Sequence, residues 1–297
     1  MKIRAATRGS PLALWQTNKV ISLLSAAFPE LEIEIVIVET AGDKDRETSL
    51  SELGGQGVFV KEVQLAVLEG KADFAIHSAK DLPATSLDGL ELIAFPERAD
   101  PRDVLVGNRW EDLPHEACIA TGSIRRKAHL LHLRPDLCFE DLRGNIETRL
   151  KKAEHYDAIV MAKAALDRLG LTPEVVDVLN PSTLLPQVGQ GALAIESRSQ
   201  DEELKSLFSE INHKDTHRAV SAERAFLYEL GTGCDLPIAA NAVVSEDEIS
   251  LTAVVSSMDG KSFLKTTETG QESLSLGKSV AQTLLDTQGG RELLKKQ

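Results

Sequence analysis

From residue 2 to residue 169, the apolar residues follow two alternating patterns, one typical of strands and the other typical of helices. Alternating or continuously apolar runs, typical of strands, occupy residues 2–7, 32–38, 73–77, 118–120, 137–142 and 157–162. Runs with apolar residues three and four positions apart, typical of helices, occupy residues 12–28, 58–69, 124–133 and 146–154, with a further run ending at 169. This alternation predicts an α/β fold with two successive lobes, each built on an open, mostly parallel sheet.

The pattern changes after about residue 212. Helical periodicity at 215–230 is followed by three strand-like runs at 238–244, 249–256 and 262–267, and then by a helix at 274–285. Strands followed by a helix predict a smaller α+β domain at the C-terminal end. Residues 40–57 are polar, rich in glycine and without periodicity, which is typical of either a functional lid or a disordered segment.

Composition narrows the functional class. The chain has 297 residues, of which 42% are hydrophobic, enough for more than one packed core. No apolar run reaches the length of a membrane helix and the N-terminus lacks a signal pattern, so we expect a cytoplasmic protein without a membrane partner. A formal net charge of −13 disfavours general binding to nucleic acid.

The three cysteines are too sparse and uneven for a disulfide framework and indicate a reducing compartment. Cys118 and Cys138 lie in apolar runs, so we expect them to be buried packing residues. Cys234 lies in the turn GTGCDLP (231–237), where flanking glycines and a proline favour an exposed, reactive thiol. A small buried turn residue is an equally good interpretation from the pattern alone.

Asp81 is the first candidate for chemistry. The segment HSAKDLP (77–83) follows a predicted strand, so Asp81 would stand at the strand-to-helix corner, at the carboxyl edge of the sheet. The competing interpretation is structural: an aspartate in this context caps the N-terminus of a helix, and the local pattern by itself favours that reading.

Arginines and hydroxyls recur at several predicted strand ends. Arg8 precedes the helix that Ser10 would cap, and TGSIRR (121–126) places two hydroxyls and two arginines at another helix start. LRGN (142–145) brings Arg143 to a third strand end, with Arg149 in the next helix. Any one of these arginines is most simply a surface residue, but together they suit the binding of several carboxylates, because the guanidinium group takes a carboxylate in two parallel bonds.

Two further patterns are weaker signals of function. His213 and His217 stand four apart on a predicted helix but lack an acidic third ligand at a familiar spacing, so we expect no metal site. Gly54, Gly55 and Gly57 precede a helix and would suit an anion, although the lysine and hydroxyl of a P-loop are missing.

Taken in order, these segments resemble the porphobilinogen deaminase (hydroxymethylbilane synthase) family. The matching segments are TRGSPLA (7–13), VKE (60–62), HSAKDLP (77–83), SIRR (123–126), LRGN (142–145), VGQGA (188–192) and GC (233–234). The resemblance implies two lobes like those of solute-binding proteins and three domains: residues 1–96 with 192–210, residues 102–187, and residues 214–297. It also implies a monomer.

The resemblance implies a transferase of porphyrin and haem biosynthesis. Such an enzyme deaminates four porphobilinogen molecules and joins them head to tail into hydroxymethylbilane on a dipyrromethane primer, here held by Cys234 through a thioether. Asp81 would be the catalytic carboxylate that stabilises positive charge on the pyrrole nitrogens. The implied cofactor contacts are Ser78, Lys80, Asp81, Thr121, Ser123, Arg125, Arg126 and Arg143. The implied substrate contacts are Arg8, Ser10, Arg149, Arg168 and Gln190.

The chain departs from the family pattern in its lid, where Gln56 and Glu52 replace lysines found in relatives. These changes put affinity and rate in question, so a relative that binds pyrroles with poor turnover is one competing hypothesis. The alternative from another class is a non-enzymatic solute-binding or effector-sensing protein with the same lobes, which would have no need of Cys234 or of a third domain.

Overall fold

The computed structural model describes residues 1–40, 60–231 and 236–295. The chain forms two compact units, one of Met1–Ala99 with Ala192–Arg218 and the other of Asp100–Gly191 with Ala219–Gln297. It therefore passes from one unit to the other more than once. The three-domain boundaries expected from the sequence stay a prediction. Among the described residues, no helix is long and apolar enough to cross a membrane.

The first unit is built on a five-stranded sheet in the order β2-β1-β3-β10-β4. Its strands are β1 (Lys2–Arg8), β2 (Glu32–Val38), β3 (Phe74–Ser78), β4 (Leu90–Ala94) and β10 (Leu193–Arg198). β1 runs parallel to β2 and β3, whereas β10 runs antiparallel to both β3 and β4. The sheet is thus mixed, with four strands in one direction and the returning strand β10 opposed to them.

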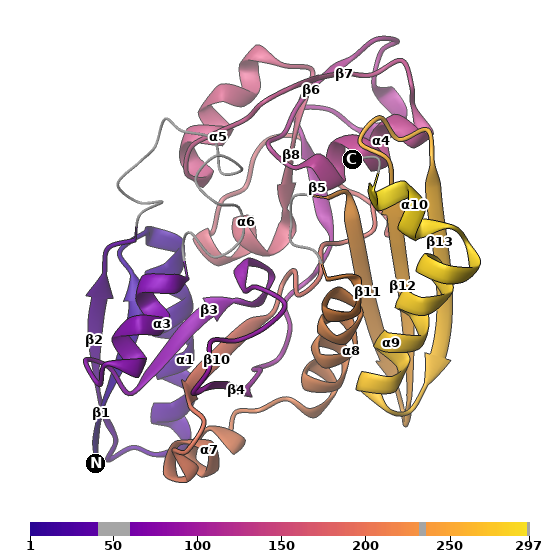
Figure 1. Ribbon diagram of the computed structural model, residues 1–297. Helices are drawn as coiled ribbons and strands as arrows, with labels where there is room; N and C mark the ends of the chain where they lie inside the picture. Colours follow the sequence, from indigo (N-terminus) through magenta and orange to yellow (C-terminus); the bar gives the residue numbers. More distant parts are fainter. Residues whose placement is uncertain (41–59, 232–235, 296–297) are drawn as a thin grey trace. The chain divides into compact units, whose positions relative to one another are not determined.

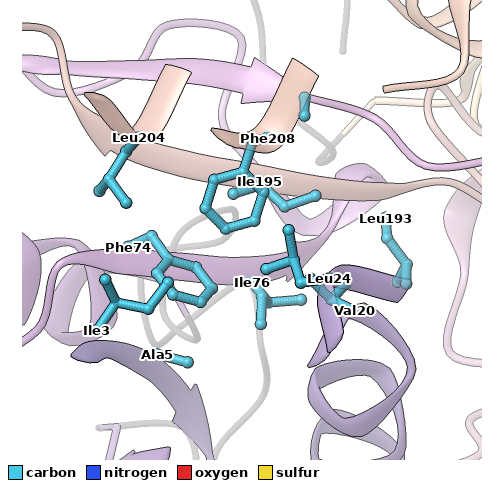
Figure 2. Packing of buried hydrophobic residues seen from close by; sticks show 11 residues of the cluster. Ile3, Ala5, Val20, Leu24, Phe74, Ile76, Leu193, Ile195, Leu204 and Phe208 are labelled. Atoms are coloured by element: carbon cyan, nitrogen blue, oxygen red, sulfur yellow. The ribbon is translucent and has the colours of Figure 1, made fainter. Parts of the chain in front are cut away.

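Side chains alternate between the two faces of this sheet with the period of a strand. On one face, Phe74 and Ile195 form a core with Phe208 of α7 (Glu202–Ser209) and with α1 (Pro11–Ala27). Figure 2 shows Phe208 and Leu204 directed from α7 towards Phe74, whose ring meets that of Phe208 edge to face at 4.7 Å. α3 (Lys61–Leu68) covers the other face.

The second unit contains a sheet of the same plan, in the order β7-β6-β8-β5-β9. Its strands are β5 (Asp103–Val106), β6 (Cys118–Ala120), β7 (Cys138–Glu140), β8 (Ala158–Ala162) and β9 (Val176–Val178). Here β5, the first strand after the chain enters this unit, is the one opposed to the others. α4 (Ile124–Leu133) packs on one face, and α5 (Ile146–Lys152) and α6 (Lys163–Leu169) pack on the other.

The C-terminal part of the second unit is an antiparallel meander of β11 (Ile238–Ser245), β12 (Glu248–Ser256) and β13 (Phe263–Gly270). α9 (Ser273–Gln282) lies along β12 and β13 (Figure 1), and α10 (Gly290–Lys295) follows it. α8 (Lys214–Leu230) precedes the meander in the chain. The expectation of an α/β fold with a smaller α+β C-terminal part is confirmed.

Most predicted elements are found at or within a few residues of their expected positions. β2 and β6 match their predicted bounds, and α1 begins at Pro11 with Ser10 as its N-cap. Among the described elements, four strands and two α-helices had no prediction from periodicity: β4, β5, β9, β10, α7 and α10. β4, β5 and β9 are short, so their few apolar residues give no clear period.

Candidate active site

A pocket of the first unit lies at the carboxyl ends of β1 and β3. Arg8, at the end of β1, and Ser10 line it together with Ser78, the last residue of β3, and Asp81. Parallel neighbours in a sheet end at the same edge, which is why segments far apart in the sequence meet here. The predicted placement of these residues at strand ends is confirmed, and the structure brings four of them together.

Asp81 ends a short 3₁₀ turn, Ala79–Asp81, and the chain then continues in an extended conformation at Leu82. No α-helix starts after it within the described residues 82–89, so the competing interpretation of Asp81 as a helix N-cap is wrong. Its side chain lies on the pocket wall and is half-buried, as is the neighbouring Lys80. The carboxylate is therefore available to a bound molecule.

The two serines of this pocket have defined orientations. The Ser10 oxygen accepts a 3.3 Å bond from the Ala13 amide, and the Ser78 oxygen accepts a 2.8 Å bond from the Gln16 side chain. A hydroxyl has one donor and two acceptor positions, so an accepted bond leaves its O–H group as a donor. Both serines are thereby suited to donate to an oxygen anion in the pocket.

A buried polar network supports the pocket wall. His77 lines the pocket, and its Nε2 atom lies 3.1 Å from the carboxylate of Glu196 on β10. The Gln64 amide donates to both Glu196 oxygens at 3.0 Å. Burial acts to raise the pKa of Glu196, but hydrogen bonds from His77 and Gln64 hold that pKa below its usual value. The network fixes His77 beside the residues that the sequence singled out.

A second group of predicted residues lies in the second unit, on the first turn of α4. Arg125 and Arg126 are buried, and each donates a 2.7 Å bond to a different oxygen of Asp103, which is fully buried at the start of β5. Burial acts to raise the pKa of Asp103, but the two guanidinium groups lower it to about 2. Two cations share one anion, so the cluster keeps one positive charge.

The hydroxyls before α4 repeat the arrangement of the first pocket. The Thr121 oxygen accepts a 3.2 Å bond from the Ser123 amide, and the Ser123 oxygen caps α4 by accepting a 3.4 Å bond from the Arg126 amide. Their O–H groups remain as donors next to a helix N-terminus, where backbone dipoles also favour an anion.

Gln190 and Arg168 hold the turn that leads back to the first unit. The Gln190 amide donates to the Pro101 carbonyl at 2.7 Å and to Asp103 at 3.0 Å, and Arg168 donates to the Gly191 carbonyl at 2.8 Å. Both side chains are buried. In this structure Gln190 and Arg168 hold the turn together, and their roles as substrate contacts stay predictions.

Arg143 and Arg149 lie on the loop after β7 and on α5. Arg143 is 38% exposed and pairs with Asp141 at 2.7 Å, and Arg149 donates to the Gly144 carbonyl at 2.8 Å. The adjacent Asn145 caps α5 through its side chain. Arg143 thus lies after a strand end and Arg149 on the following helix, where the sequence placed them. Their roles as cofactor and substrate contacts stay predictions.

The remaining sequence-based expectations concern the cysteines, two lid residues and a metal site. Cys234, Gln56 and Glu52 lie outside the described residues. The expected burial of the two other cysteines is wrong, because Cys138 is exposed and Cys118 is partly exposed. The described residues contain no group of three side chains that could hold a metal ion.

Asp103, Glu196 and Gln64 were missed from the sequence. Asp103 stands at the head of the apolar run DVLV (103–106), a visible signal for a buried carboxylate, but the run is too short for a firm strand prediction. Glu196 lies in the apolar run LAIES (193–197), where a charge also stands out. Neither pattern identifies the residue that pairs with the buried carboxylate. Arg125 is 22 residues from Asp103 in the sequence, and His77 is 119 residues from Glu196.

Comparison with known proteins supplies the family. A family model described as "Porphobilinogen deaminase, dipyromethane cofactor binding domain" matches residues 3–206, and "Porphobilinogen deaminase, C-terminal domain" matches residues 217–286. A relative named porphobilinogen deaminase from Brevibacillus brevis is 46% identical, covering 99% of this chain and 96% of its own length. Another of that name from Geotalea uraniireducens is 44% identical, covering 98% and 93%.

Similarity to solved structures is weaker. The BenM effector binding domain with its effector benzoate aligns with a TM-score of 0.40 at 16% identity, covering 71% of this chain and 90% of that chain. Similarity at this level carries no inference about what the chain binds.

Proposed function

The chain belongs to the porphobilinogen deaminase family, and from that premise we propose how its own residues perform the reaction. The activity is that of a transferase in porphyrin and haem biosynthesis. It deaminates four porphobilinogen molecules and joins them head to tail into hydroxymethylbilane, on a dipyrromethane primer. The alternative of a non-enzymatic solute-binding or effector-sensing protein is not favoured, because both family matches and the relatives at 44–46% identity are deaminases.

The observation that carries the mechanism is the set of groups lining the pocket of the first unit. A pyrrole offers an N–H donor, and each porphobilinogen ring also bears two carboxylate substituents. In the pocket, the Asp81 carboxylate can accept the pyrrole N–H bond, and Arg8, Ser10 and Ser78 can donate to the carboxylates. The residues present therefore fit dipyrromethane and the growing chain. When bound, dipyrromethane supplies the free pyrrole carbon to which the first porphobilinogen is joined.

Asp81 acts as the catalytic residue by electrostatics. Loss of ammonia and the following carbon–carbon bond formation both place positive charge on a pyrrole nitrogen. An ionised carboxylate that accepts the ring N–H bond stabilises this charge more strongly in the transition state than in the ground state. His77, held by Glu196, fixes the wall from which Ser78 and Asp81 project.

Each unit by itself offers cationic groups for carboxylate binding. The Arg125–Arg126–Asp103 cluster keeps a net positive charge, and Thr121 and Ser123 add hydroxyl donors beside it. The remaining contacts follow the resemblance: Lys80, Arg143, Arg149, Arg168 and Gln190. Each guanidinium is already partly oriented by an internal bond, so less side-chain freedom is lost when a carboxylate binds.

Cys234 is the proposed attachment point of dipyrromethane through a thioether. This assignment rests on the matching GC segment (233–234) of the family pattern. We further propose that the enzyme works in the cytoplasm as a monomer, and that residues 1–96 with 192–210, 102–187 and 214–297 are its three domains. Light scattering on the purified protein tests the oligomeric state directly.

Intact mass and ammonia release test the proposed function together. The purified protein should be heavier than its sequence mass by two deaminated porphobilinogen units, and it should release ammonia from porphobilinogen. Cys234→Ser should lose the added mass, whereas the matched variant Cys138→Ser should keep it. A folded wild-type protein with the bare sequence mass and no ammonia release would refute the proposal, and an adduct on another residue would refute the Cys234 assignment alone.

A further inference from the structure

Two cysteines that the mechanism does not use lie side by side in the second unit. Cys118 on β6 and Cys138 on β7 are register partners in the parallel pairing of these strands. β7 is the edge strand of its sheet, which leaves Cys138 exposed and Cys118 partly exposed. Partners in adjacent strands direct their side chains to the same face of a sheet. The two thiols therefore lie near each other on that face.

The strand geometry allows these two sulfurs to bond. Neighbouring strands lie about 4.7–4.9 Å apart, and disulfides join Cα atoms that are about 4.4–6.8 Å apart. The backbone around the pair is held in place, because the Cys138 amide donates to the Ala117 carbonyl at 3.0 Å and the Cys118 amide donates to the Asp157 carboxylate at 2.7 Å. The register pairing therefore places the two Cα atoms at a separation that a disulfide can span.

The two thiols differ in their readiness to react. Burial, with the nearby Cys138 and the acidic side chains of Glu140 and Asp157, raises the pKa of the Cys118 thiol. Cys118 therefore remains protonated at neutral pH, while Cys138 faces solvent on the edge strand. An exposed thiol reacts first with an oxidant, and a thiol held beside it resolves the product.

We propose that Cys118 and Cys138 form a modification site that hydroperoxides oxidise reversibly to an intrachain disulfide. In the first step the Cys138 thiolate attacks a peroxide oxygen; an S–O bond forms, the O–O bond breaks, and the leaving oxygen takes a proton to become water or an alcohol. In the second step the Cys118 sulfur attacks the Cys138 sulfur; the S–S bond forms, the S–O bond breaks, and the hydroxyl leaves as water with the Cys118 proton. Two thiols are oxidised and one hydroperoxide is reduced.

Each strand that carries one of these cysteines leads directly into a loop that the proposed mechanism uses. β6 leads into the segment TGS (121–123) before α4, and β7 leads into the loop that carries Arg143. A disulfide would tie the two strands together just before both loops. The chemistry of the pair does not depend on the proposed function, and its test does not use turnover.

The test treats the purified full-length protein with hydrogen peroxide, alkylates the remaining thiols and maps the peptides by mass spectrometry. We expect one linked peptide pair that contains Cys118 and Cys138, a protein mass lower by two hydrogen atoms, and full reversal by dithiothreitol. Mapping the linked peptides distinguishes this bond from any reaction of Cys234.

Two matched variants separate the roles of the thiols. In Cys118→Ser, Cys138 should stop at the sulfenic acid, which a cyclic diketone traps. In Cys138→Ser, Cys118 should remain alkylatable, reacting with peroxide about tenfold more slowly than Cys138 does. Oxidation of Cys138 beyond the sulfenic acid in the wild type while Cys118 stays free would overturn the proposal. Links only to Cys234 or between molecules would also overturn it, and these outcomes are read on the wild type even if a variant fails to fold.

Discussion

At the scale of single residues, the proposed role of the Asp81 carboxylate can be tested directly by substitution. It stands on a pocket wall beside a guanidinium and two hydroxyls, and it ends a 3₁₀ turn in place of capping a helix. Its replacement should therefore leave the local backbone intact. What it removes is a negative charge next to the pyrrole nitrogens.

Asp81→Asn should fold normally and lower the rate of hydroxymethylbilane formation by about 10²- to 10³-fold, the usual loss when one transition-state electrostatic contact is removed. The amide is close in shape but carries no charge. Asp88→Asn, an exposed position of the same unit, is the control and should keep its rate. A rate within a few fold of wild type for Asp81→Asn would remove Asp81 from the mechanism.

Asp103 is the residue on which the second group of arginines depends. Asp103→Asn leaves two buried guanidinium groups without their shared anion, which should lower the free energy of unfolding by about 3–5 kcal/mol. Asp100→Asn breaks a pair with Arg102, whose side chain is 41% exposed, and should cost about 1 kcal/mol or less. Urea denaturation measures both, and equal losses would contradict the buried-pair account.

At the scale of elements, the turn between β12 and β13 packs against α4. The His132 ring bonds the Gly260 carbonyl through Nδ1 at 3.0 Å and stacks on Phe263 with 4.2 Å between ring centroids. α4 begins with Arg125 and Arg126. The C-terminal meander is thus attached directly to the helix that carries the cationic cluster.

Gly260 makes this close packing possible. Its φ angle is +70°, and a Cβ atom there would lie 2.5 Å from the Ala128 carbonyl. Gly260→Ala should therefore cost about 1 kcal/mol for the left-handed backbone and about 1–3 kcal/mol more for overpacking. Gly70→Ala is the matched control, since Gly70 has a φ of +69° with open space around it and should cost only the first amount. Thermal unfolding of the two variants at the same pH compares these losses, and equal shifts would contradict the contact with α4.

At the scale of the whole molecule, charge and pH act through a few buried groups. The formal net charge is −13, yet buried cations gather around Asp103 in the second unit. His129 of α4 is buried in the same unit, where burial first and the positive charge of Arg125 second lower its pKa to about 3. It remains neutral in the folded protein above about pH 3.

Acid should destabilise the protein in two pH windows that overlap between about pH 4 and pH 3. The unfolded chain protonates His129 near pH 6.5 and the folded chain does not, so stability should fall by up to about 1.4 kcal/mol per pH unit below about pH 6.5. Asp103 has a lowered pKa, so its contribution is full above about pH 4 and is lost as the pH falls towards about 2.

Urea midpoints between pH 7 and pH 4.5 measure the first window. His129→Phe keeps a ring against Phe263 but cannot titrate, so its stability should vary less with pH than that of the wild type. His155→Phe changes an exposed histidine and should retain the wild-type slope. Identical slopes in all three proteins would exclude His129 as the titrating group.

Local sequence patterns determined much of this protein. Hydrophobic period located β1, β2, α1 and α4, because burial on one face of an element imposes a repeat that needs only neighbouring residues. Cap residues such as Ser10 and Ser123 marked helix starts for the same local reason. The order of motifs indicated the family, and strand ends located the residues that would face a ligand.

Only the tertiary structure decided which distant groups meet. Hydrophobic periodicity cannot show that β10 returns to lie between β3 and β4. That return places Glu196 in contact with His77, which is 119 residues away in the sequence. In the same way β5 lies between β8 and β9, and this brings Asp103 under both arginines of α4. Sheet order is set by the burial of whole faces, and a buried charge takes its partner from whatever strand that order places beside it.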